Sequence, residues 1–112
     1  MSLEVSRQLD AIGVETVTGH AVLTIADSWP WSDAKSHLVA LQNKFNAYFE
    51  FIESGQVHDC YPSSKGRQLR INVVFRFRPP AEALTLLAEA AKAASQLDVL
   101  ISHETFVGKT AG

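Results

Sequence analysis

The fold is decided by one stretch, Leu69-Arg70-Ile71-Asn72-Val73-Val74-Phe75-Arg76-Phe77-Arg78, which is the most regular alternation in the chain. Every second residue from Leu69 to Phe77 is apolar, and the residues between them are mostly arginine or asparagine. Successive side chains of a strand point to opposite faces, so the pattern predicts a strand with its apolar set, Phe77 included, in the core. A register shift of one residue would bury the arginines. The apolar residues must therefore face the core and the arginines must face outward.

Other strands are expected on both sides of this stretch. Residues 10–14 and 21–25 are β-prone, and Thr18-Gly19 between them predicts an antiparallel hairpin in which Gly19 takes a positive φ. Residues 99–106 predict a last strand, and Val57 to Tyr61 is compatible with a short edge strand.

Two helices are expected from apolar residues at helical spacing. The first is predicted to run for roughly 20 residues and to end at Ser54-Gly55. Its apolar stripe consists of Ala34, Leu38, Leu41, Phe45, Tyr48 and Ile52. The second is predicted after Pro79-Pro80, with a stripe made of Leu84, Leu87, Ala88 and Ala91, extended by Ala94.

The element order β-β-α-β-α-β predicts an α+β two-layer sandwich. We expect a four- or five-stranded, mainly antiparallel sheet with both helices on one face. The 112 residues suit a single domain, with an ordered core of about 9–107. No apolar run approaches the roughly 20 residues that cross a membrane, and the start resembles no signal peptide. The single cysteine, Cys60, fits a cytoplasmic location.

Charge is distributed unevenly along a chain whose net charge is −2. Residues 65–78 hold five basic side chains and no acidic one, so the other five basic and 12 acidic residues give the rest −7. The basic residues are Lys65, Arg67, Arg70, Arg76 and Arg78. They indicate either the solvated face of a strand, which we favour, or a surface for an acidic partner.

Candidate catalytic chemistry is sparse. Cys60 with His58 is a candidate nucleophile and base, but two residues apart on a strand place them about 7 Å from each other, too far for direct proton transfer. The four histidines have no zinc-binding spacing, and Ser63-Ser64-Lys65-Gly66-Arg67 lacks the glycines of a phosphate-binding loop. We therefore expect no metal and no cofactor.

Candidate binding residues are the arginines of the long strand and two tryptophans. Arg70, Arg76 and Arg78 share its outward face, but the aromatic residues that would stack nucleic-acid bases fall on the inward face, so nucleic acid is an unlikely partner. Trp29 and Trp31 flank a proline before the first helix and suit either a core cap or an interface.

A longer pattern carries a family resemblance that covers nearly the whole chain from about residue 9. It comprises Asp10-Ala11-Ile12-Gly13, Val22-Leu23-Thr24-Ile25-Ala26-Asp27, Trp31, His37-Leu38, Leu41-Gln42-x-Lys44-x-Asn46-Ala47-Tyr48, Phe51-Ile52-Glu53-Ser54-Gly55, Tyr61-Pro62-x-x-Lys65-Gly66-Arg67 and Pro79-Pro80. This pattern resembles a small bacterial domain family of unknown function. The resemblance implies no activity, cofactor or catalytic residue.

Three hypotheses follow. The leading one is a non-catalytic protein-interaction or accessory module, of the inhibitor or immunity type by fold-level analogy, or a homodimer through a sheet face or edge. Its contact residues would be Arg70, Arg76, Arg78, Trp29 and Trp31. The alternative is a thiol hydrolase that uses Cys60 with a histidine, and the third is a weak binder of single-stranded nucleic acid on the arginine face.

Overall fold

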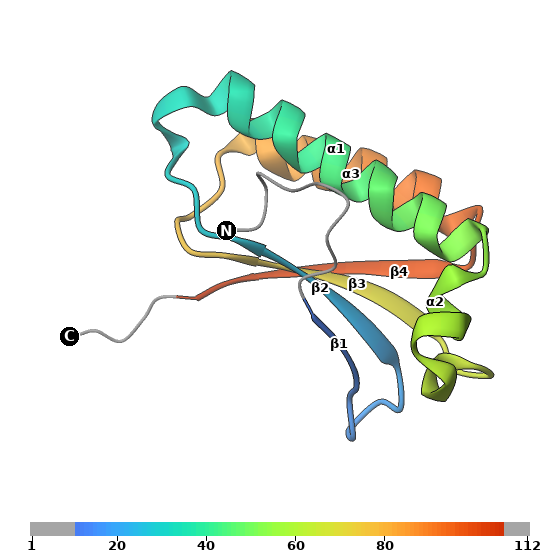
Figure 1. Ribbon diagram of the computed structural model, residues 1–112. Coiled ribbons are helices and arrows are strands. Elements are labelled where there is room, and N and C mark those ends of the chain that lie inside the picture. Colours follow the sequence, from blue (N-terminus) through green and yellow to red (C-terminus); the bar gives the residue numbers. More distant parts are fainter. Residues whose placement is uncertain (1–10, 107–112) are drawn as a thin grey trace.

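The molecule has two layers, a four-stranded sheet and a pair of long helices that cover one of its faces (Figure 1). The computed structural model describes residues 11–106, so the expected core of about 9–107 extends outside the described residues at both ends. The strands are β1 (Ala11–Val14), β2 (Ala21–Asp27), β3 (Leu69–Phe75) and β4 (Val99–Thr105). The helices are α1 (Ala34–Glu53), α2 (Gln56–Cys60) and α3 (Ala81–Ser95), with 3₁₀ turns at Trp31–Asp33 and Pro62–Ser64.

The sheet is mixed, in the order β1-β2-β3-β4. β1 pairs with β2 antiparallel, whereas β2 with β3 and β3 with β4 pair in parallel. The α+β class and the four strands are confirmed, but the expected mainly antiparallel pairing and the count of two helices are wrong. The chain crosses from β2 to β3 through α1 and from β3 to β4 through α3. Both crossovers move in the same direction across the sheet and have the same hand, so α1 and α3 lie on the same face.

The β1–β2 hairpin forms as the sequence predicts. Gly19 has φ +76° and its N–H donates to the Glu15 carbonyl at 2.7 Å, while the Glu15 N–H donates to the His20 carbonyl at 2.9 Å. Ala21, Leu23 and Ile25 then face the helices with no exposed surface. The hairpin thus sets the register of β2 in the core.

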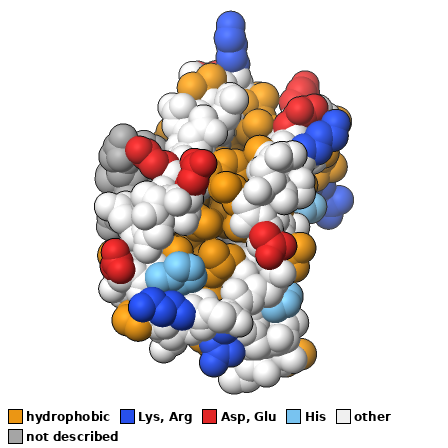
Figure 2. All heavy atoms as spheres, turned by 90° about the vertical axis from the view of Figure 1, so that its right-hand side faces the viewer, with side chains coloured by type: hydrophobic (Ala, Val, Ile, Leu, Met, Phe, Trp, Pro, Cys, Tyr) orange, Lys and Arg blue, Asp and Glu red, His pale blue; other side chains and the backbone are white. Residues whose placement is uncertain are grey.

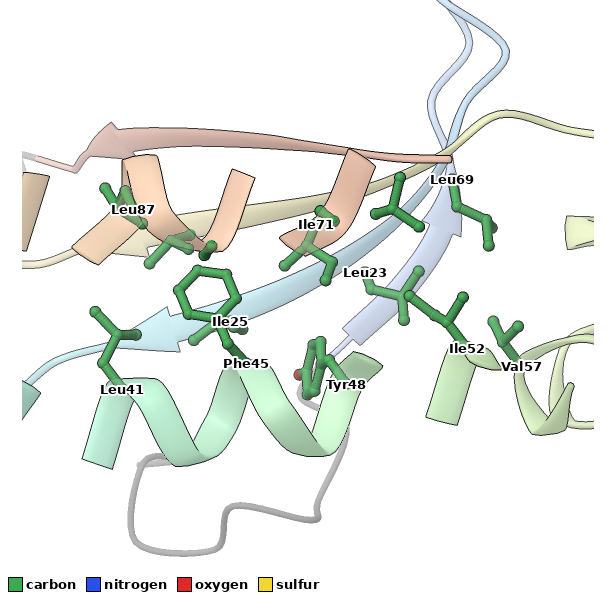
Figure 3. Packing of buried hydrophobic residues seen from close by; sticks show 14 of the residues in the cluster. Leu23, Ile25, Leu41, Phe45, Tyr48, Ile52, Val57, Leu69, Ile71 and Leu87 are labelled. Carbon is green, nitrogen blue, oxygen red and sulfur yellow. The ribbon is translucent and has the colours of Figure 1, made fainter. Parts of the chain in front are cut away.

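Helix α1 packs its predicted stripe against the sheet. Leu41, Phe45, Tyr48 and Ile52 are buried, and Figure 3 shows their side chains directed toward Leu23, Ile25 and Ile71 of the strands. The Tyr48 hydroxyl donates to the Thr24 carbonyl at 2.7 Å, which ties the helix to β2. Gly55, with φ +86°, ends the helix at the predicted place.

The prediction for the end of the long strand is wrong. β3 ends at Phe75, opposite the last residue of β2, and Arg76, Phe77 and Arg78 lie beyond it. Phe77 is 44% exposed instead of buried. Past Phe75 there is no neighbouring β2 residue to pair with, and the prolines that follow turn the chain toward α3.

The prediction of a short edge strand at residues 57–61 is also wrong, because this segment belongs to α2 and its C-terminal cap. After Gly55 the chain re-enters helical conformation and buries Val57 against the core.

Helix α3 is rotated from its predicted orientation. Leu84, Ala88 and Ala91 are exposed, and the buried residues are Ala83, Leu87, Ala90 and Ala94. Three of these four are alanines, which lets the helix backbone approach the sheet closely and leaves the larger Leu84 outside.

Candidate functional site

The carboxyl ends of the three parallel strands meet at one edge of the sheet. Asp27 of β2, Phe75 of β3 and Thr105 of β4 are register partners there. In open sheets with parallel strands, ligands bind preferentially at this edge. The segments that leave it are therefore the first place to look for a site.

A buried polar pair lies at this edge. The Nε2 atom of His37, in the first turn of α1, is 2.5 Å from Oδ2 of Asp27, and both residues are at most 2% exposed. The other ring nitrogen, Nδ1, is 3.2 Å from the Pro30 carbonyl oxygen, and Asp27 Oδ1 accepts a hydrogen bond of 3.1 Å from the Trp29 N–H. The pair thereby fixes the connection between β2 and α1.

The electrostatics of the pair favour a structural role. Burial raises the pKa of the Asp27 carboxyl above its ordinary value, while the hydrogen bond and charge of His37 and the Trp29 N–H act in the opposite direction. Both ring nitrogens of His37 face oxygen atoms, so each has a hydrogen-bond partner within the chain. A pair with so little exposed surface cannot reach a substrate, and we assign it to positioning rather than to acid–base catalysis.

The two tryptophans cover this pair. The Trp31 ring stacks on His37, with 3.5 Å between ring centroids and 14° between planes, and Trp29 lies 5.5 Å away at 55°. The Nε1–H of Trp31 donates to the Phe77 carbonyl at 3.3 Å. Both tryptophans are half-buried, so each combines a contact to the interior with an exposed part.

Exposed apolar and cationic groups lie at the same end of the parallel strands as the tryptophans. Phe77 is 44% exposed and Phe106, which follows β4, is 61% exposed. The Arg76 guanidinium lies 5.9 Å from the centre of the Phe77 ring. We name Trp29, Trp31, Arg76, Phe77 and Phe106 the carboxyl-edge cluster. A shallow hollow of about 140 Å³ lies beside it, lined by Ala26, Asp27, Ser28, Val74, Arg76 and Phe106.

The predicted contact residues divide between two places. Trp29, Trp31 and Arg76 come together in the cluster, and Arg78 follows Phe77 in the same exposed segment. Arg70 lies apart from them, on the sheet face away from the helices.

On that outer face Arg70 belongs to a chain of hydrogen-bonded side chains. Its Nη2 is 2.5 Å from Glu15 Oε1, and its Nη1 donates to Ser102 Oγ at 3.3 Å. Ser102 donates to Asn72 Oδ1 at 2.8 Å, and Asn72 donates to Glu104 Oε2 at 2.9 Å. Because Glu15 offsets the Arg70 charge, this face offers little attraction to a phosphate backbone.

The candidate thiol pair is not brought together. His58 directs Nδ1 to the hydroxyl of Ser64, at 2.7 Å, and Ser64 is completely buried. Cys60 is exposed at the end of α2. Residues two apart on a helix do not face each other, so His58 is not placed to take a proton from Cys60.

The surface and the remaining side chains add three findings. Figure 2 shows, on the end of the molecule that is at the right of Figure 1, a central band of hydrophobic side chains with charges of both signs scattered around it. Among residues 11–106, no three histidine, cysteine, aspartate or glutamate side chains are grouped closely enough to hold a metal ion. Within that same range, no helix is long and apolar enough to cross a membrane.

Sequence reasoning missed the Asp27–His37 pair and Phe106. The signal for the pair was present, since Asp27 continues the inward series Ala21, Leu23, Ile25, and His37 precedes Leu41 by one helical step of four. An inward-facing carboxyl requires a partner, and the first turn of α1 supplies it.

Comparisons with known proteins agree with the sequence pattern. The family model described as "Family of unknown function (DUF6572)" matches residues 1–106. Neither the curated proteins nor the solved structures contain a match. The model spans nearly all of the chain, which therefore belongs to this family of unknown function.

Proposed function

We propose that the protein is a non-catalytic interaction module that binds another protein through the carboxyl-edge cluster. One observation carries the proposal. Residues from three distant segments, at 29–31, 76–77 and 106, place two tryptophans, an arginine and two exposed phenylalanines at one edge of the sheet.

The composition of the cluster is that of a binding hot spot. Tryptophan and arginine are enriched among the interface residues that contribute most binding energy. Phe77 and Phe106 expose large apolar rings, whose burial by a partner would be favourable at roughly 25 cal/mol per Å². The Trp31 ring is held by its stacking on His37 and by its hydrogen bond to the Phe77 carbonyl, which reduces the entropy that Trp31 loses on binding.

Charge argues for a partner other than a second copy at this place. A twofold contact brings the same patch of both subunits together, so Arg76 and Arg78 of both copies would enter one interface. A partner that presents carboxylates beside an apolar side chain fits better, because it would pair with Arg76 and cover the phenylalanine rings. Binding of this kind is compatible with the inhibitor or immunity class, an assignment that rests on fold-level analogy.

A charge reversal at Arg76 tests the proposal. The Arg76→Glu and Phe106→Ala variants are compared with Lys65→Glu, an exposed charge reversal in the loop before β3. Proteins captured by the wild type from a lysate of the source cells are identified and purified, and their affinities for the four proteins are measured by calorimetry.

The expected result is at least about a tenfold loss of affinity for Arg76→Glu and Phe106→Ala, with less than about a twofold change for Lys65→Glu. Far-UV circular dichroism establishes that all the variants are folded. A partner that binds the two cluster variants as tightly as the wild type would show that the cluster is not the binding surface.

A further inference from the structure

We infer that a second copy of this chain docks along the open edge of β4, so that the two sheets join into one continuous sheet. This inference concerns a different surface from the carboxyl-edge cluster and goes beyond the proposed function. It rests on three observations: the unpaired edge of β4, the apolar side of α3 above it, and the self-complementary pattern of β4.

The first observation is that, among the strands of residues 11–106, β4 pairs on one side only, with β3. The Phe106 N–H donates to the Phe75 carbonyl, so by alternation the backbone groups of residues 100, 102 and 104 also point to β3. Those of Ile101, His103 and Thr105 then point outward. The seven residues of β4 contain no proline and no lysine, the residues that commonly block such an edge.

The second observation concerns the sides of α3. Ala83, Leu87, Ala90 and Ala94 face the sheet, and Leu86, Glu89 and Ala93 line a hollow shared with α1. At 100° per residue, Leu84, Ala88 and Ala91 lie on the flank opposite α1. All three are exposed, Leu84 by 45%, and none is charged. Because α3 connects β3 to β4, this flank faces the side of the molecule on which the edge of β4 is open.

A second copy covers both features at once. A single extended peptide would satisfy the backbone groups of β4 but would leave the α3 flank in water. A twofold axis perpendicular to the sheet places the second copy antiparallel along β4 and brings its own α3 alongside. Packed helices lie 8–10 Å apart, and Ala88 and Ala91 are small enough to allow so close an approach of the two α3 helices.

The third observation is the pattern of β4. When the whole of β4 pairs antiparallel with β4 of the second copy, the twofold axis passes beside Ser102, the middle residue of Val99–Thr105. Ile101 then lies opposite the partner's His103, and Leu100 lies opposite the partner's Glu104. No two like charges are directly opposed, and the residues with outward backbone groups meet one another as ladder formation requires.

Light scattering and a disulfide test this arrangement. Molar mass is measured from about 1 to about 100 µM, where a reversible dimer gains mass with concentration. In the Cys60→Ser background, Ser102→Cys places two thiols opposite each other at a separation that a disulfide bridges. Glu104→Cys in the same background is the matched control, since its thiol faces Leu100 of the partner subunit. We expect a dimer, and rapid cross-linking for Ser102→Cys but not for Glu104→Cys.

Two substitutions test the surfaces separately. His103→Pro removes an outward N–H and leaves the bonds to β3 in place, and Ala91→Glu sets two carboxylates against each other on the α3 flanks. Thr85→Glu, on the solvent side of α3, is the control. The first two variants are expected to weaken the dimer at least tenfold while keeping the wild-type circular dichroism spectrum, and Thr85→Glu to leave it unchanged.

Several outcomes would overturn the inference. They are a monomer at every concentration, a dimer that His103→Pro and Ala91→Glu leave intact, or cross-linking that favours Glu104→Cys. The Arg76→Glu variant is expected to dimerise like the wild type, so the failure of this inference is distinguishable from the failure of the proposed function.

Discussion

The two ends of the sheet are closed in different ways. Where the parallel strands begin, long polar side chains bond to backbone carbonyls: Arg67 donates to Gly19 and Ser63 at 3.1 and 2.9 Å, and Gln68 donates to Asp98 at 2.8 Å. Where the strands end, a buried Asp27–His37 pair lies under aromatic rings, and two phenylalanines remain exposed.

This difference separates a part that completes the fold from a part that is suited to binding. At the first end the side chains of Arg67 and Gln68 bond to backbone carbonyls of the same chain. At the second end a buried, hydrogen-bonded pair is covered by the Trp31 ring, and the rings of Phe77 and Phe106 remain exposed. Such an arrangement is stable before a partner arrives and gains more apolar burial when one binds.

Removal of the His37 ring is expected to have the largest effect. His37→Ala leaves the Asp27 carboxyl buried without its partner and opens a cavity under Trp31, so the free energy of unfolding should fall by about 3 kcal/mol. Urea denaturation followed by far-UV circular dichroism measures this loss. Phe77→Ala, at the same end but exposed, should change stability by less than about 0.5 kcal/mol. Equal losses of stability in both variants would contradict the distinction between the buried Asp27–His37 pair and the exposed phenylalanine rings.

The pH dependence of stability is expected to reveal Asp27. Its pKa is raised in the folded state by burial, so between pH 3.8 and the raised value the folded chain binds more protons than the unfolded chain. The contribution of Asp27 to the free energy of unfolding is therefore greatest below pH 3.8 and falls as pH rises, by at most about 1.4 kcal/mol per pH unit.

Asp27→Asn removes this contribution, so the comparison is between the two proteins across the acidic range. Stability measured by urea denaturation should decline more with rising pH in the wild type than in Asp27→Asn. A wild type that gains stability relative to the variant over this range would show that the hydrogen bonds to Asp27 outweigh its burial.

At the opposite end of the strands a smaller effect than that of His37→Ala is expected. Arg67→Ala removes the guanidinium bonds to the Gly19 and Ser63 carbonyls, which are exposed and can bond to water instead. The expected loss is about 1 kcal/mol, measured by thermal unfolding, with Lys65→Ala as a control close to zero. A loss as large as that of His37→Ala would mean that both ends contribute equally to the fold.

Much of the fold follows from local pattern, and the errors have physical causes. The Gly19 hairpin, the stripe of α1 and the inward face of β2 are encoded by residues close in sequence. The parallel pairing of β2 with β3 is not, because it depends on which strand a crossover returns to. The end of β3 at Phe75 depends in the same way on where its neighbour ends.

The site was foreseen in part. The expected contact residues were Trp29, Trp31, Arg70, Arg76 and Arg78. The structure places Trp29, Trp31 and Arg76 at the carboxyl edge and Arg70 apart from them, and their role in binding stays a prediction. Phe106 could not be added from the sequence, because its place beside Val74 and Ala26 results from the parallel ladder of β3 and β4.

The stacking of both tryptophans around His37 has an optical consequence. The chain contains two tryptophans, so all of its indole fluorescence originates within one contact of this histidine. Emission therefore reports the carboxyl edge alone, whereas the far-ultraviolet signal reports all the helices and strands. A fluorescence transition that precedes the loss of secondary structure would be the signature of this edge opening locally before the rest of the molecule unfolds.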